Sequence, residues 1–98
     1  MTAAASLVVY SRDYCGYCFR LERALNHANV AYDRRDIHED REAAAFVRSV
    51  NNGDETVPTV VINGTDVRVN PKPADLLQAL GVEPEPSLWT KLAGGHRN

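Results

Sequence analysis

The 98-residue sequence predicts one α/β domain, built on a four-stranded mixed sheet with helices on both faces. Three observations support this prediction. Short β-branched runs alternate with segments whose apolar residues recur at helical spacing. Their order is strand, helix, strand, helix, two strands, helix, which is typical of a mixed sheet. The last two strands are separated by Asn63-Gly64, a strong hairpin signal. The first two strands are expected to be parallel, joined by a right-handed crossover.

The first strand and the first helix meet at the only two cysteines of the chain. The strand is the apolar run at residues 7–10, and apolar residues then recur at helical spacing to about residue 29: Cys18, Leu21, Leu25 and Ala28. Cys15 is thus expected at the helix start, where unpaired backbone N–H groups and the helix dipole favour an anion. Cys18 lies one turn further on the same face, within reach for a disulfide.

The middle of the chain predicts an edge strand followed by a second helix. Residues 30–37 are extended in character but heavily charged, which suits the edge of a sheet. A helix starts near Glu39 or Asp40 and ends at Asn51-Asn52-Gly53. Its apolar face is expected to contain Ala43, Phe46, Val47 and Val50.

The last elements are a hairpin, a third helix and a tail. Residues 59–62 form a β-branched run, Asn63-Gly64 predicts a two-residue turn, and residues 65–69 supply the return strand. Asn70 is expected to cap a helix that has Pro71 in its first turn and ends at Gly81. We therefore expect a domain over residues 1–82 and a tail over residues 83–98 that forms a short helix packed on the domain.

Composition excludes several classes of partner. The net charge of −2 and the pI near 5.8 offer no general attraction to nucleic acid or to an anionic membrane. No run approaches the ~20 apolar residues of a membrane span. We expect a cytoplasmic protein, and in a reducing cytosol two cysteines at this spacing indicate a redox pair or metal ligands more often than a structural disulfide.

For the cysteine pair, a redox role is favoured over a metal or cluster role and over a structural role. A structural zinc site needs four ligands, and the histidines at positions 27, 38 and 96 show no recognised spacing, so no metal site is expected. Arg12, three residues before Cys15, could place a cation near the thiol. Arg20 and Arg23 lie on the polar side of the first helix and are interpreted as solvated charges.

Two motifs in this order of elements resemble a glutaredoxin of the thioredoxin fold. They are Cys15-Gly16-Tyr17-Cys18 after the first strand and Thr56-Val57-Pro58 before the third. More narrowly, the Cys-Gly-Tyr-Cys motif, the helix start at residues 40–45 and the Thr-Val-Pro-Thr-Val run are similar to those of mycoredoxins, glutaredoxin-like enzymes that work with mycothiol. The resemblance covers roughly residues 6–81.

The resemblance implies a role for each matching residue. Cys15 is the nucleophile and Cys18 the resolving thiol. Pro58 is a cis proline facing the Cys15 sulfur, and Val57 offers its backbone N–H and C=O to the thiol substrate. The remaining residues expected to bind the small thiol are Arg12, Tyr17, Thr56 and Asn70. No bound cofactor is implied; mycothiol, or another low-molecular-weight thiol, is the co-substrate.

Two positions depart from the common glutaredoxin pattern. Gly16 stands where most members have proline, and residues 69–75 replace the Gly-Gly and acidic pair with which many members hold the γ-glutamyl end of glutathione. Mycothiol has a sugar–inositol body in place of that group. The expected function is therefore reduction of protein–mycothiol mixed disulfides by a monomer whose partners are the small thiol and S-thiolated proteins.

Two alternatives stay open. One is a thioredoxin-like electron donor that is reduced directly by a flavin disulfide reductase. The other is a carrier of a [2Fe–2S] cluster, because some glutaredoxins with a small residue in place of the motif proline bridge such a cluster between two protomers.

Overall fold

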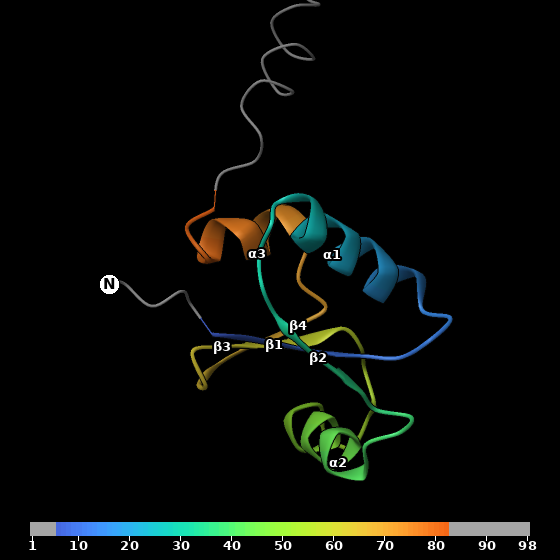
Figure 1. Cartoon of the computed structure of the whole chain (residues 1–98). Helices are drawn as coiled ribbons and strands as arrows, with labels where there is room; N and C mark the ends of the chain where they lie inside the picture. Colours follow the sequence, from blue (N-terminus) through green and yellow to red (C-terminus); the bar gives the residue numbers. More distant parts are fainter. Residues whose placement is uncertain (1–5, 83–98) are drawn as a thin grey trace, which may run out of the picture.

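The computed structural model describes residues 6–82, which form one four-stranded sheet and three helices (Figure 1). The elements in chain order are β1 (Leu7–Ser11), α1 (Gly16–His27), β2 (Asp33–Asp36), α2 (Arg41–Val50), β3 (Thr59–Ile62), β4 (Asp66–Val69) and α3 (Pro73–Ala79). This order confirms the predicted fold class. The proposed tail at residues 83–98, which includes the last histidine, lies outside the described residues.

The sheet has the strand order β2-β1-β3-β4, with the first strand near its centre. β1 runs parallel to β2, with Val9 opposite Arg34, and antiparallel to β3, with Val9 opposite Val60. The charged strand β2 lies at an edge, as expected, although it covers only residues 33–36. β1 and β3 carry most of the buried strand residues because helices cover both of their faces.

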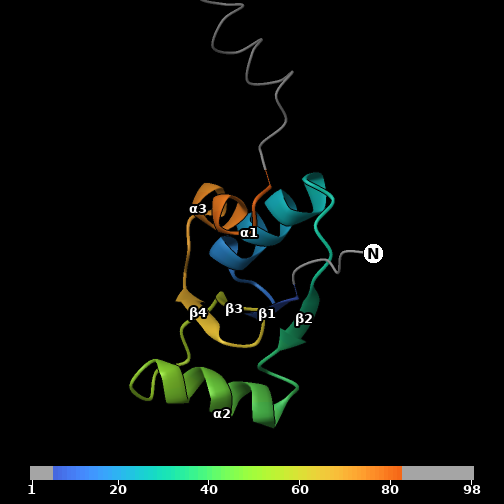
Figure 2. The same ribbon diagram turned by 90° about the vertical axis from the view of Figure 1, so that its left-hand side faces the viewer.

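The helices lie in two layers on opposite sides of the sheet. α1 and α3 cover one face and α2 covers the other (Figures 1 and 2). The main core lies under α1 and α3 and contains Leu7, Val9, Leu21, Leu25, Val60, Ile62, Leu76 and Leu77. On the other face, Tyr10 of β1 stacks on Phe46 of α2 with ring centroids 4.9 Å apart. Each fully buried aliphatic side chain stabilises the fold by about 1.5–3 kcal/mol relative to exposure.

The hairpin differs from the prediction by one residue. Its loop contains Asn63, Gly64 and Thr65, and Ile62 pairs with Asp66. The first two loop residues have φ values of 53° and 81°, in the left-handed region that asparagine and glycine tolerate. Asn63 also exchanges hydrogen bonds with the backbone of Ser6, so it extends the ladder beside β1 and the return strand begins later.

The start of α3 was predicted wrongly. The helix begins at Pro73 with Lys72 as its N-cap, not with Asn70. The physical reason is the second proline, which disfavours helical geometry for the residue before it, and Lys72 is accordingly extended with ψ 141°. Asn70 has φ 46° and donates its backbone N–H to the carbonyl of Pro58 at 2.7 Å, which joins the loop before α3 to the loop before β3.

No helix within residues 6–82 is long and apolar enough to span a membrane.

Candidate functional site

Cys15 is the N-cap residue of α1, as the sequence predicts. Its backbone is extended, with φ −114° and ψ 110°, and its sulfur accepts a hydrogen bond from the backbone N–H of Cys18 at 3.2 Å. Its carbonyl accepts the first helical hydrogen bond, from Phe19. The sulfur therefore occupies the place of the side-chain oxygen in an ordinary N-cap, where the unpaired N–H groups of the first turn point at it. The positive end of the helix dipole also lies at this position.

Cys18 has a very different environment. Both cysteines are free thiols, but Cys18 is 1% exposed whereas Cys15 is half-buried. Cys18 packs with Ile37 and Val57 in the smaller core on the α2 side. Burial, and to a lesser extent a hydrogen bond with Cys15, raises the pKa of the Cys18 thiol from 9.0 to about 11. At neutral pH, therefore, Cys18 is protonated and shielded from solvent.

This asymmetry predicts selective alkylation. At pH 7–8, iodoacetamide is expected to modify Cys15 alone in the folded, reduced protein, because the alkylating agent reacts with accessible thiolates. Peptide mapping by mass spectrometry measures the modified position, and protein unfolded in urea, where both cysteines react, is the control. Equal modification of both cysteines in the folded protein would contradict the assignment.

The same raised pKa predicts a pH dependence of stability. The folded protein holds the Cys18 proton more tightly than the unfolded chain does, and this difference adds to the free energy of unfolding. The contribution is complete below about pH 9 and is lost as the pH rises through about 11.

The loop before β3 faces the Cys15 sulfur. The Val57–Pro58 peptide bond is cis, as the resemblance implies, and the carbonyl oxygen of Val57 lies 3.9 Å from the Cys15 sulfur. The buried hydroxyl of Thr59 donates to the carbonyl of Thr56 at 2.8 Å and so holds the loop from inside. Together with the bond from Asn70 to Pro58, these contacts fix the loop opposite the start of α1.

The other predicted substrate contacts lie around this position. Arg12 is exposed and lines the groove that also contains Cys15. Tyr17 is 61% exposed, lies on the outer side of the helix start, and has the guanidinium of Arg20 over its ring at 5.8 Å. The structure therefore brings Val57 and Arg12 to Cys15, and it joins Asn70 to Pro58. It does not make Asn70 a helix cap.

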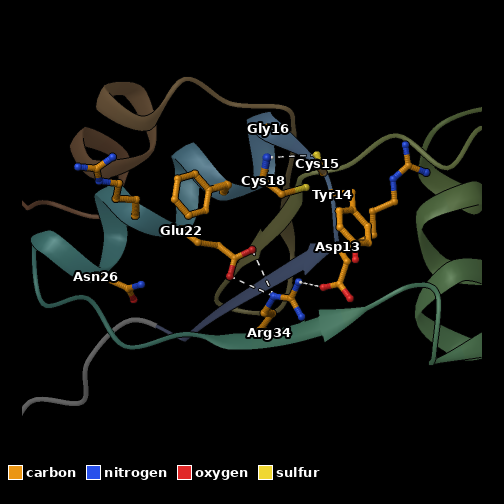
Figure 3. Close-up of a pocket in the computed structure, with 11 residues that line it drawn as sticks. Asp13, Tyr14, Cys15, Gly16, Cys18, Glu22, Asn26 and Arg34 are labelled. Atoms are coloured by element: carbon orange, nitrogen blue, oxygen red, sulfur yellow. Dashed lines mark hydrogen bonds and ion pairs between the residues drawn. The ribbon is translucent and has the colours of Figure 1, made fainter.

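A groove of about 630 Å³ extends from Cys15 along α1 to Asn26 (Figure 3). Tyr14 and Phe19 are both well exposed and line it. Beneath the two cysteines, Glu22 and Arg34 form an ion pair at 3.1 Å.

Glu22 is the centre of a network that was not predicted from the sequence. Its carboxylate accepts hydrogen bonds from the fully buried hydroxyl of Ser11 at 2.7 Å, from Tyr32 and from Arg34. A signal was present in the sequence, because Glu22 lies four residues after Cys18, at the border of the apolar face of the helix. The network fixes α1 to β1 and β2, and so holds the helix that bears both cysteines.

Among residues 6–82, no group of three or more His, Cys, Asp or Glu side chains is arranged to hold a metal ion. The cluster-carrier alternative involves a second protomer and an external thiol, and it stays a prediction.

Comparison with known proteins points in the same direction as this geometry. The profile of the glutaredoxin family matches residues 7–67. The chain is 47% identical over 75 residues to a Mycobacterium tuberculosis protein provisionally named a glutaredoxin, covering 76% of this chain and 88% of that one. It is 34% identical over 73 residues to mycoredoxin 1 of Corynebacterium glutamicum, covering 74% and 90%. Among solved structures, a variant of the thioredoxin-like protein BC3987 superposes with a TM-score of 0.70 at 31% identity, covering 79% and 96%.

Proposed function

The chain belongs to the glutaredoxin family, and we propose that it reduces mixed disulfides between proteins and mycothiol. Its fold is thioredoxin-like, and its Cys15–Cys18 pair is that of a glutaredoxin-like thiol-disulfide oxidoreductase. Membership of this family implies a low-molecular-weight thiol as co-substrate. The identity of that thiol and the roles of the individual site residues are the proposed part.

The proposed mechanism rests on one observation, namely that the two thiols differ in their exposure and in their hydrogen bonds. Cys15 is accessible and its sulfur accepts a backbone N–H at the helix start, whereas Cys18 is buried and protonated at neutral pH. Thiol–disulfide exchange requires an accessible thiolate. Cys15 is therefore the sulfur that attacks, and Cys18 is not needed for this first step.

The reaction then has two steps that use one protein sulfur. The Cys15 thiolate attacks the sulfur of the small thiol, the mixed disulfide of the substrate breaks, and the substrate protein leaves as a thiolate. A second molecule of the small thiol, as its thiolate, attacks the small-thiol sulfur of the new disulfide, forms the small-thiol disulfide and releases the Cys15 thiolate. In the other route Cys18 loses its proton to solvent, attacks Cys15 and releases the small thiol. A flavin disulfide reductase would reduce the small-thiol disulfide.

Two features favour mycothiol over glutathione. The relative at 34% identity is named a mycoredoxin. The stretch from the end of β4 to the first residue of α3 has Pro71, Lys72 and Pro73 where many glutaredoxins have the acidic pair that holds the amino end of glutathione. Backbone groups of Val57 and the polar side chains of Arg12 and Asn70 would bind the thiol beside Cys15.

The test is to incubate the reduced protein separately with mycothiol disulfide and with glutathione disulfide. Mass spectrometry then identifies each adduct and its rate of formation. We expect a Cys15–mycothiol adduct that forms about tenfold or more faster than the glutathione adduct. Equal rates would overturn the mycothiol assignment, and failure to form either adduct would overturn the small-thiol mechanism.

We also propose that the protein acts as a monomer in the cytoplasm and that its protein partners are S-thiolated proteins. Gel filtration against the calculated 10.8 kDa of the chain tests the first of these expectations.

A further inference from the structure

A groove of about 690 Å³ between α1 and the start of α3 is lined by four basic residues, by Ala24, Pro73 and Ala74, and by no acidic residue. Arg20, Arg23 and His27 come from α1, and Lys72 is the residue directly before α3. The whole chain carries a net charge of −2. This surface, called here the basic groove, is therefore opposite in sign to the chain as a whole.

Three cations of the basic groove have no carboxylate partner within residues 6–82. The arginines that do pair with a described carboxylate within 4.0 Å are Arg34, Arg35, Arg48 and Arg68. For Arg20, Arg23 and Lys72 the described part of the chain supplies no such pair, and the guanidinium of Arg20 lies over the ring of Tyr17. Their charges remain available to a ligand.

The basic groove is continuous with the surface around Cys15. Arg23 lines both the basic groove and the groove that reaches Cys15, and Arg20 lines a small hollow of about 240 Å³ with Gly16 and Tyr17. With a rise of 1.5 Å per residue, Arg20 and Arg23 lie roughly 8 and 12 Å from Cys15 along the helix axis. An extended polypeptide covers these distances in about two to four residues.

The surface on the other side of Cys15 has the opposite charge. A groove of about 730 Å³ between β2 and α2 contains more acidic than basic residues: Asp13, Asp36, Glu39, Asp40 and Glu42 against Arg34, Arg35 and Arg41. Two of its arginines form ion pairs with these carboxylates, Arg34 with Asp13 and Asp36 and Arg35 with Asp40. An acidic ligand that reaches Cys15 would be repelled from this side and attracted to the basic groove.

We propose that the basic groove binds an acidic segment of the protein substrate, about two to five residues from the cysteine that carries the small thiol. This inference rests on the proposed function, because it assigns the polypeptide part of the same mixed disulfide. Arginine suits this role because its planar guanidinium binds carboxylates through two parallel hydrogen bonds. The site would select substrate cysteines by the charge of the sequence around them.

The test uses short peptides with one central cysteine held as a mixed disulfide with mycothiol. One peptide has glutamates about two to five residues from the cysteine, and the other has glutamines at the same positions. We expect kcat/KM for the glutamate peptide to be about tenfold higher at low salt. The ratio should approach one in about 0.5 M salt, where screening acts within roughly 4 Å.

Two charge reversals locate the effect. Arg23→Glu should reduce the ratio between the two peptides to about threefold or less. Arg41→Glu is the matched control, because Arg41 is also exposed and forms no ion pair with a carboxylate of residues 6–82, but lies at the start of α2 on the other side of Cys15. It makes the same change in net charge and should leave the ratio unchanged. An equal loss in both variants would show a general charge effect and overturn the assignment to the groove.

A binding measurement with peptides that cannot undergo disulfide exchange separates this inference from the proposed function. Fluorescence anisotropy with labelled peptides in which serine replaces the cysteine measures the groove alone. Tighter binding of the glutamate peptide, lost in Arg23→Glu, supports the inference even if no mixed disulfide is reduced. Equal binding of both peptides, or tighter binding of a single-stranded oligonucleotide of the same charge, overturns it. Failure to reduce the glutamine peptide disulfide would instead contradict the proposed function.

Discussion

Cys15→Ser is expected to lower turnover of a protein–mycothiol mixed disulfide by about a thousandfold or more, because a hydroxyl cannot replace the attacking thiolate. Cys18 cannot take over this role in the folded protein. Cys18 is 1% exposed, and burial raises the pKa of its thiol to about 11. It also lies one turn further into α1, away from the positive end of the helix dipole. The measurement is a coupled assay with mycothiol and its reductase.

Cys18→Ser, in the same assay, is expected to keep substantial activity. A second molecule of mycothiol can release the small thiol from Cys15, so the resolving thiol is optional. Serine also preserves the backbone N–H that donates to the Cys15 sulfur at 3.2 Å. A thioredoxin-like donor would behave differently, because there the second cysteine must release a protein-bound intermediate. Loss of activity in Cys18→Ser as complete as in Cys15→Ser would support that alternative.

The second large effect concerns stability. Leu25→Ala is expected to lower the free energy of unfolding by about 2–5 kcal/mol. Leu25 is fully buried between α1 and the sheet, so truncation leaves a cavity in the main core. Such a loss is a large part of the 5–15 kcal/mol that holds a typical domain folded. An equilibrium urea titration gives the midpoint and the slope of the transition, and these give the change in the free energy of unfolding.

Phe19→Ala is the matched control on the same helix. Phe19 is larger than Leu25 but 66% exposed, so its truncation should change the free energy of unfolding by no more than about 0.5 kcal/mol. Comparable losses in the two variants would mean that α1 does not pack with the face assigned to it.

The helices and strands could be predicted from the sequence because each has a buried side and an exposed side, and this difference leaves a periodic pattern of apolar residues. The spacing of Cys18, Leu21 and Leu25 placed α1 correctly, and these three residues are its buried positions. The charges of residues 33–36 indicated an edge strand, since charged side chains remain in contact with water at the edge of a sheet. In these elements the local pattern of apolar and charged residues determines which side is buried.

The two errors have different causes, a contact distant in sequence at the hairpin and a second proline at the start of α3. Asn63 bonds to Ser6, and this contact moves the start of β4 by one residue. Asn70 has the composition of a helix cap, but it donates to the Pro58 carbonyl, while Pro73 sets the helix start. Local sequence rules contain no term for the contacts of Asn63 and Asn70, whereas the effect of Pro73 on Lys72 is local.

The site was predictable at its cysteines and less so around them. Cys15 at the helix start follows from the strand-to-helix junction alone. The network of Ser11, Glu22 and Arg34 depends on the parallel register of β1 and β2, which places Arg34 opposite Val9. The charge separation between the two sides of Cys15 likewise depends on which elements are neighbours in space.

The identity of the sulfur that receives the small thiol is the central claim, and one trapping experiment tests it most directly. The Cys18→Ser variant is mixed with a protein–mycothiol mixed disulfide while the recycling thiol is withheld, and the products are analysed by intact and peptide mass spectrometry. The mechanism predicts mycothiol on Cys15 and a released substrate protein with a free thiol. A disulfide joining Cys15 to the substrate protein, with mycothiol released, would contradict it.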